Sequence, residues 1–138
     1  MARILAIDYG TKRCGLAVTD PMQMIASPLD TIPTEKVLDF LKGYFSKENV
    51  ERIVLGDPRQ LDNTGSEMTH LTNRFAHKLK HHFPDIELIR YDERLTSKMA
   101  MQAMTQSGQG KKVKNDKGML DRVSAAILLQ DYLSSKTK

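Results

Sequence analysis

Three carboxylates stand at positions from which they could share one site. Asp8 ends an apolar run, Glu93 follows a second apolar run, and Asp121 lies near the start of a long helical pattern. Carboxylate oxygens are hard ligands that suit Mg²⁺ or Mn²⁺. Two such ions, roughly 4 Å apart, could activate a water and stabilise the departing 3′-oxygen of a phosphodiester. Spacing along the chain does not by itself show that the three side chains meet.

Each carboxylate also has an ordinary structural explanation. Asp8 could cap the turn at Gly10, because aspartate often bonds to the backbone of a turn. Glu93 could pair with Arg94 or cap the helix that follows it. Asp121 could favour the positive end of its own helix. The hypothesis of a shared site therefore depends on the three residues as a set.

Hydrophobic patterning predicts the elements that would position these side chains. Strands are expected at 3–8, 14–19, 24–32, 51–55 and 86–91, and helices at 34–45, 66–82, 96–106 and 118–133. Thr34 is the expected N-cap of the first helix, and Pro28 favours an edge position for the third strand. The ends of the strands before Asp8, Asp57 and Glu93 would lie at the edge of the sheet where open α/β folds bind ligands.

The order of these elements, βββ-α-β-α-β-α-α, predicts an α/β fold. The first three strands are close enough in sequence to form an antiparallel meander. The last two alternate with helices, which calls for parallel pairing through right-handed crossovers. We expect a mixed five-stranded sheet with helices on both faces. No linker divides the chain, so residues 1–138 are expected to form one domain.

The composition indicates a soluble protein that would accept polyanionic partners. The formal net charge is +4, which mildly favours nucleic acid. Cys14 is the only cysteine, so an internal disulfide and a cysteine-based zinc site are excluded and a reducing cytosol is favoured. No stretch approaches the roughly 20 apolar residues of a membrane span. We expect a cytoplasmic protein that is a monomer or a weak homodimer.

Two basic segments could hold a phosphate backbone. Thr11, Lys12 and Arg13 follow Asp8 in the first turn, although a solvated turn would have the same composition. The second segment is a polar loop before the last helix, with the lysines Lys111, Lys112, Lys114 and Lys117. Such a run is often only solvated, but here it could clamp nucleic acid electrostatically. Arg94 could contact phosphate or pair with a carboxylate of the site.

Four motifs together resemble one protein family. Residues 8–18, Asp-Tyr-Gly-Thr-Lys-Arg-Cys-Gly-Leu-Ala-Val, resemble the opening signature of the YqgF/RuvX proteins, which are bacterial RNase H-like nucleases. The resemblance continues through residues 54–58, 92–97 and 117–126, in order and at the length of the family. The combination is specific, whereas the first motif alone is not.

The resemblance implies the RNase H-like fold that is also found in Holliday-junction resolvases. It implies metal-dependent hydrolysis of phosphodiesters, with Asp8, Glu93 and Asp121 as the acidic triad and Mg²⁺ or Mn²⁺ as the metal. Maturation of the 5′ end of 16S ribosomal RNA would be the role, and structured RNA or branched DNA the partner. Asp57 departs from the family, which often has an apolar residue there; the extra carboxylate could assist metal binding or repel the scissile phosphate.

Other functions remain open at this point. A Holliday junction resolvase acting on DNA would use the same acids, and a nucleic-acid-binding ribosome assembly factor would need no catalysis. The sequence Asp8-Tyr9-Gly10-Thr11 also resembles the first phosphate loop of the actin and sugar-kinase superfamily. Those proteins need a second, similar domain to close over the nucleotide, and a chain of 138 residues has no room for one.

Overall fold

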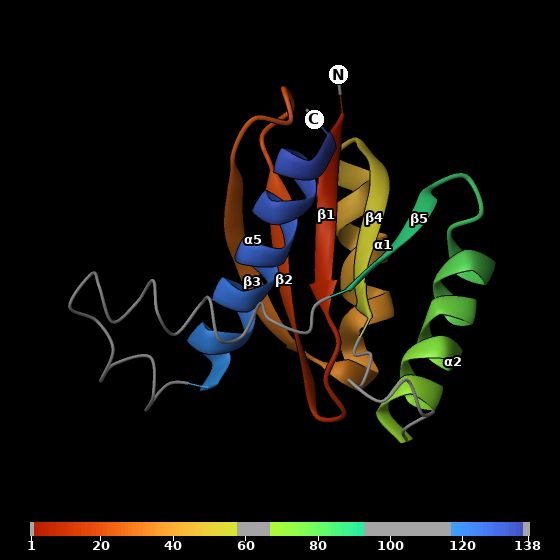
Figure 1. Ribbon diagram of the computed structural model, residues 1–138. Helices are drawn as coiled ribbons and strands as arrows, with labels where there is room; N and C mark the ends of the chain where they lie inside the picture. Colours follow the sequence, from red (N-terminus) through yellow and green to blue (C-terminus); the bar gives the residue numbers. More distant parts are fainter. Residues whose placement is uncertain (1, 58–66, 93–116, 137–138) are drawn as a thin grey trace.

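The structure, a computed structural model, describes residues 2–57, 67–92 and 117–136, with only the backbone of residues 117 and 136. Five strands and four helical segments follow one another along these residues (Figure 1). They are β1 (Arg3–Asp8), β2 (Arg13–Thr19), β3 (Ala26–Pro33), the short 3₁₀ helix η1 (Thr34–Lys36), α1 (Val37–Lys47), β4 (Val50–Asp57), α2 (Glu67–His82), β5 (Glu87–Asp92) and α5 (Lys117–Lys136).

The strands form one mixed sheet in the order β3-β2-β1-β4-β5. β1, β2 and β3 are antiparallel neighbours, and β4 and β5 run parallel to β1. The predicted sheet is therefore confirmed. Pro28 lies on the edge strand β3, next to an irregularity in its pairing with β2, as expected for a residue that cannot donate a backbone hydrogen bond.

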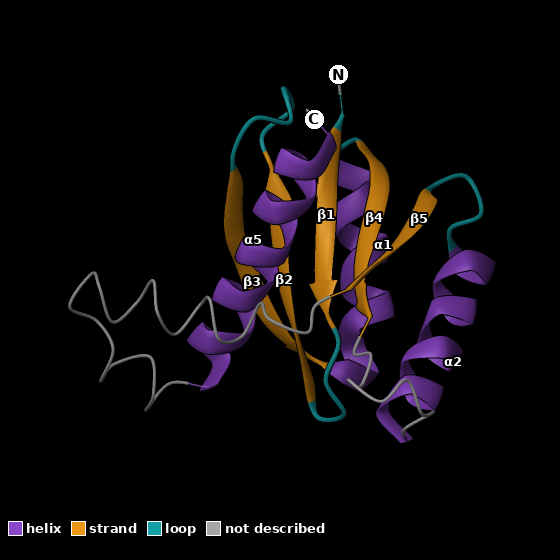
Figure 2. Ribbon diagram, in the orientation of Figure 1, coloured by secondary structure: helices purple, strands orange, loops and turns teal. Residues whose placement is uncertain are grey.

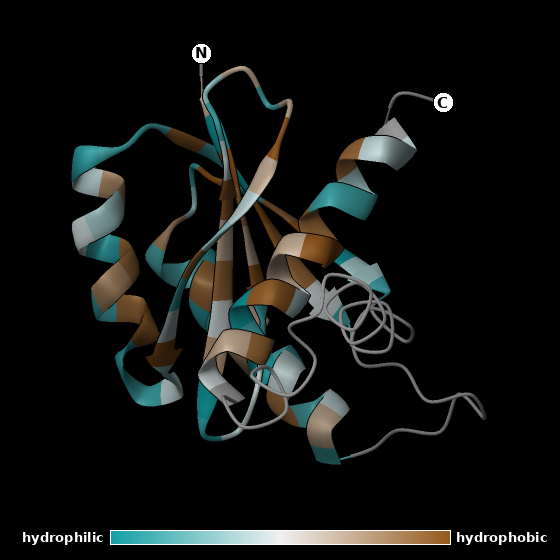
Figure 3. Cartoon of the chain, turned by 90° about the vertical axis from the view of Figure 1, so that its left-hand side faces the viewer, coloured by the Kyte–Doolittle hydropathy of each residue, from teal (hydrophilic) through white to brown (hydrophobic). Residues whose placement is uncertain are grey.

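Each face of the sheet has its own hydrophobic core, because side chains alternate between the faces along every strand. Leu5 and Ile7 of β1 pack with residues of α1 and α2. Ile4 and Ala6 of the same strand pack with residues of α5. Helices consequently cover both faces, with α5 in front of the sheet and α1 behind it in Figure 2. Figure 3 shows the hydrophobic residues concentrated in the strands and alternating with hydrophilic ones along the helices.

Two sequence predictions about local structure are wrong. Thr34 does not cap the first helix: it belongs to η1, whose N-cap is Pro33, and α1 follows with Lys36 as its N-cap; neither helix has a side-chain cap bond. Asp57 was expected in a loop but is the last residue of β4, paired with Asp92 of β5. The helix predicted at 96–106 lies outside the described residues, as does the loop predicted at 107–117 apart from residue 117, which begins α5.

Candidate active site

Asp8 lies at the carboxyl end of β1, on the face of the sheet that α5 covers. Its strand places Ile4 and Ala6 in the core beneath α5, and the alternation of side chains puts Asp8 on that face as well. Asp8 is half-buried and pairs across the β1–β2 ladder with Gly15. A carboxylate thus ends the central strand without entering the core.

Asp121 reaches the same face from α5. The buried residues of this helix recur as Ser124–Ala125, Leu128–Leu129 and Tyr132–Leu133, which is the spacing of one helical face. Asp121 lies one turn before Ser124–Ala125 on this stripe, so it continues the stripe toward the carboxyl end of β1. The first turn of α5 contains no acidic residue, and Asp121 therefore does not serve the helix dipole there.

Gly15 lets the two carboxylates approach. A Cβ at Gly15 would overlap the backbone carbonyl of Asp121 and lie 2.8 Å from the backbone nitrogen of Arg122. Only a glycine allows this approach of helix to strand. Because Gly15 pairs with Asp8 in the β1–β2 ladder, the backbone of Asp121 rests directly over the neighbour of Asp8.

The buried thiol of Cys14 lies on β2 between the turn and Gly15. Burial raises its pKa above the ordinary value of 9.0, and the negative charges of Asp8 and Asp121 raise it further. Both carboxylates are therefore within electrostatic reach of one side chain. The raised pKa favours the protonated thiol of Cys14.

Side chains from β3 and α5 fix the start of α5 on the sheet. The hydroxyl of Thr31 donates to the carbonyl of Gly118, and Arg122 Nη1 donates to Thr31 Oγ1 over 3.3 Å. Thr31 pairs with Gly15 in the β2–β3 ladder. These bonds hold the turn of α5 that carries Asp121 above the end of the sheet. Nothing in the sequence marks Thr31 for this role, because its spacing carries no signal.

Thr34 holds the turn between β1 and β2. Its hydroxyl donates to the carbonyl of Gly10 over 2.6 Å, and its backbone nitrogen donates to the carbonyl of Lys12 over 3.1 Å. A Cβ at Gly10 would overlap the carbonyl of Arg13, so this tight turn requires glycine there. Thr34 thus positions the turn that follows Asp8 instead of capping a helix.

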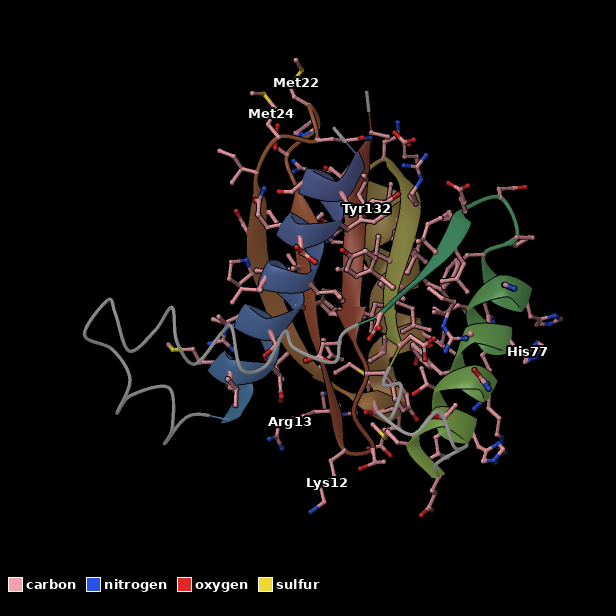
Figure 4. All side chains as sticks on the ribbon, in the orientation of Figure 1. Lys12, Arg13, Met22, Met24, His77 and Tyr132 are labelled. Atoms are coloured by element: carbon pink, nitrogen blue, oxygen red, sulfur yellow. The ribbon has the colours of Figure 1, made fainter. Side chains whose placement is uncertain are left out.

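Thr11, Lys12 and Arg13 come together with Asp121 around one hollow of about 360 Å³. Arg13 Nε forms an ion pair with Asp121 Oδ2. Lys12 and Arg13 lie at the lower end of the sheet in Figure 4, opposite Met22 and Met24. Cations at this end would attract a phosphate, and the ion pair of Arg13 orients one of the two carboxylates.

Asp57 does not share this face. Ile53 and Leu55 of β4 pack with α1 and α2, and alternation places Asp57 with them. Asp57 is buried and forms an ion pair with Arg90 (Nη2 to Oδ1, 3.5 Å). Arg90 Nη1 also donates to Asn73 Oδ1 of α2 over 3.0 Å. Alternation thus places Asp57 on the opposite face of the sheet from Asp8, and Arg90 gives it a structural ion-pair partner there.

Several predicted site residues lie outside the described residues. They are Glu93, Arg94, Lys111, Lys112 and Lys114, together with the side chain of Lys117. Within residues 2–57, 67–92 and 117–136, no three side chains of His, Cys, Asp or Glu gather as a metal site. Asp8 and Asp121 nevertheless supply the hard carboxylate oxygens that Mg²⁺ and Mn²⁺ accept, so the donors present fit such an ion.

Sequence comparison identifies the family. The family described as "RuvX: Holliday junction resolvase" matches residues 2–135. The chain belongs to the RuvX family. A relative from Flavobacterium johnsoniae, named "Putative pre-16S rRNA nuclease", is 55% identical over 136 residues, which cover 99% of each chain. Another from Porphyromonas gingivalis, with the same name, is 50% identical over 135 residues and 98% of each chain.

Solved structures agree on the fold of this RuvX-family chain. RuvC of Thermus thermophilus in complex with a Holliday junction substrate superposes with a TM-score of 0.57, at 15% identity, over 99% of this chain and 96% of RuvC. RuvC without the substrate gives a TM-score of 0.54 at 14% identity. At such identities the likeness shows the fold, and it confirms the predicted RNase H-like architecture.

The comparisons also confirm the predicted enzyme class. The family description and the names of the relatives both denote nucleases, which are hydrolases of nucleic-acid phosphodiester bonds. In the part of the chain that the structure describes, no helix has the length and apolar character needed to cross a membrane.

Proposed function

We propose that this protein hydrolyses phosphodiester bonds with divalent metal ions held by Asp8, Asp121 and Glu93. One observation supports the proposal above all: Asp121, Lys12 and Arg13 line the same hollow. This hollow lies at the end of the sheet where Asp8 ends β1. Such a site combines carboxylates for a metal with cations for a phosphate. Glu93 is included because it follows the last residue of β5, the strand whose Ile89 and Tyr91 pack toward α5.

Each residue has a defined task in this proposal. Asp8 of the sheet and Asp121 of α5 would hold Mg²⁺ or Mn²⁺ with their carboxylate oxygens. Arg13 fixes the orientation of Asp121 through its ion pair. Lys12, with Thr11 beside it, attracts the phosphate of the substrate into the hollow. Arg94 and the lysines at 111, 112, 114 and 117 remain candidates for further backbone contacts.

When two metal ions are bound, they supply an activated water and stabilise the charge on the leaving oxygen. The protein contributes position: helix α5 contacts β2 at Gly15, the residue that pairs with Asp8 of β1, and this contact sets the spacing of the carboxylates. Positioning of this kind accounts for a large share of catalysis in such sites.

We further propose precursor 16S ribosomal RNA as the substrate, which places the protein in the cytoplasm. Relatives that share half or more of their residues with this chain are named for that substrate. The second candidate is a branched DNA junction, because a protein of the same fold has been solved with a Holliday junction. The 15% identity to that protein makes the first candidate the stronger one.

A direct comparison of substrates tests the proposal. The protein is incubated with a precursor 16S transcript that carries its 5′ leader, and separately with a four-way DNA junction, with Mg²⁺, with Mn²⁺ or with EDTA. We expect cleavage of the transcript that EDTA abolishes. Cleavage of the junction alone would make the protein a resolvase. Tight binding of the transcript without cleavage under any metal would favour a non-catalytic assembly factor.

A further inference from the structure

A second hollow, of about 510 Å³, lies beside the turn between β1 and β2, where η1, α1 and α2 complete its walls. Thr11 and Lys12 line this hollow and also the one that contains Asp121. The two hollows therefore meet at the turn. A chain molecule held at the acidic site could continue past Lys12 into the second hollow.

The charge of this second hollow is positive. Three cations, Lys12, Arg74 and Lys78, line it together with one carboxylate, Glu35. Arg74 and Lys78 stand four residues apart on α2, so they project from the same side of the helix. Both are exposed, and neither forms an ion pair with another described residue. These cations are placed to meet an anion from outside.

The inner wall of the hollow is apolar and partly aromatic. Tyr9, Leu38, Leu71 and Phe75 contribute to it, and the rings of Tyr9 and Phe75 lie 4.9 Å apart between centroids. Tyr9 is only half-buried, so part of its ring remains accessible. Burial raises the pKa of Tyr9 above 10.0, and its neutral hydroxyl adds no charge at pH 7. A flat, unstacked base could rest on such a wall.

We infer that this hollow binds a single-stranded nucleotide next to the scissile phosphate. Its phosphates contact Lys12, Arg74 and Lys78, and its base lies against Tyr9. Bases within a duplex are stacked and cannot reach an apolar wall, so the segment must be unpaired. The inference rests on the proposed nuclease function and adds that the substrate has a single-stranded flank beside the cut.

Removal of the two helix cations tests the electrostatic part. Labelled seven-residue oligouridine and oligothymidine are titrated with wild type and with Arg74→Gln/Lys78→Gln, without divalent metal and over a range of salt. We expect the double variant to bind either oligonucleotide at least about 5-fold more weakly, and its salt slope to fall by about 1.4, as for two lost contacts to a single strand. A duplex of the same length should bind both proteins alike.

Lys47→Gln/Lys80→Gln is the matched control. It likewise removes two exposed cations, here both lysines, but neither lines this hollow, so this variant should bind as wild type does. Equal binding by the two double variants would overturn the inference, because total charge alone would then explain it.

Tyrosine fluorescence tests the position of the base. The chain has four tyrosines and no tryptophan, so quenching by a bound base can be followed directly. We expect the bound base to quench tyrosine fluorescence in wild type and in Tyr44→Phe. Tyr9→Phe should show little quenching, although it should bind with unchanged affinity because it keeps the aromatic ring. Quenching in Tyr9→Phe as strong as in wild type would show that the base does not lie against Tyr9.

These measurements detect binding, so their failure differs from that of the proposed function. If no substrate is cleaved while Arg74→Gln/Lys78→Gln still loses affinity, the hollow stands as a nucleic-acid site and the nuclease proposal fails. If cleavage occurs and both double variants bind alike, the nuclease proposal stands and this inference fails.

Discussion

The backbone carbonyl of Asp121 occupies the space that a side chain at Gly15 would fill. A methyl group there must push α5 away from β2 and carry Asp121 with it. We predict that Gly15→Ala lowers the free energy of unfolding by about 1–3 kcal/mol, the usual cost of overpacking. Cleavage should fall further, by roughly 100-fold, because a shift of about 1 Å misplaces a catalytic group.

Gly43→Ala provides the control for this substitution. Gly43 lies in α1, and a Cβ there meets nothing within 4 Å. Alanine should raise the free energy of unfolding by about 0.5–1 kcal/mol and leave cleavage unchanged. Urea unfolding and initial cleavage rates measure both effects. Full stability and full activity of Gly15→Ala would show that the helix does not depend on this contact.

Arg13→Gln should separate activity from stability. The side chains of Arg13 and Asp121 are 35% and 26% exposed, and an ion pair so exposed contributes about 0–1 kcal/mol. The cleavage rate should nevertheless fall at least about 10-fold, because Asp121 loses the partner that orients it. Urea unfolding gives the stability and a single-turnover assay the rate.

Arg3→Gln is the corresponding control at the other end of β1. Arg3 pairs with Glu48 over 3.2 Å, with 26% and 41% exposure. It should lose a similar amount of stability and no activity. If the two variants lose activity equally, Arg13 has no role in the site.

Asp57→Asn should act on stability and leave the metal requirement alone. Asp57 is buried on the α2 side of the sheet with Arg90 as its ion-pair partner. Loss of a charged partner in a buried position should lower the free energy of unfolding by about 1–3 kcal/mol. The Mg²⁺ concentration for half-maximal cleavage should not change. A large change in that concentration, with stability intact, would return Asp57 to the metal site.

Asp20→Asn should show a stability loss that depends on pH. The carboxylate of Asp20 accepts hydrogen bonds from the backbone nitrogens of Ile25 (2.8 Å), Met24 (2.9 Å) and Met22 (3.1 Å). The bond from Ile25, foremost among them, helps to lower the pKa of Asp20 below its ordinary value of 3.8. A carboxylate whose pKa is lower in the folded state stabilises that state at pH values above the unfolded-state pKa of about 3.9. The stabilisation is lost as the pH falls through the folded-state pKa.

The measurement is the difference in free energy of unfolding between wild type and Asp20→Asn, from urea titrations between pH 2.5 and 7. The difference should be largest above about pH 4 and shrink as the pH falls below that value. A difference that is independent of pH would mean that the charge on Asp20 does not stabilise the turn between β2 and β3.

Most of the fold could be predicted because the apolar periods are clear. The runs in β1, β2 and β4 belong to buried strands, and their order with the helices leaves few topologies. Thr34 was misassigned because a threonine before a helical pattern is a typical N-cap, whereas here its hydroxyl bonds to Gly10 across the turn. Local sequence cannot reveal such a tertiary bond.

The candidate site was predictable in part. Asp8 could be predicted as a site residue because a charged side chain at the end of an apolar strand is costly to bury without a partner. The ion pair of Arg13 with Asp121 joins residues that are 108 positions apart, and no local pattern encodes it. Alternation assigns Asp57 to a face of the sheet only if β4 extends to that residue. The sequence predicts that this strand ends at residue 55, whereas β4 runs to Asp57.

The assignment of Asp8 is tested most directly by Asp8→Asn. The variant and Asp20→Asn, the same substitution at a turn remote from the site, are compared with wild type on precursor 16S transcript with Mg²⁺ and with Mn²⁺. Thermal unfolding first confirms that each variant is folded. We expect Asp8→Asn to lower the cleavage rate at least about 100-fold, as loss of a metal ligand that supplies several kcal/mol would, and Asp20→Asn to cleave at the wild-type rate. Cleavage by Asp8→Asn at the rate of wild type would contradict the metal site proposed at the end of β1.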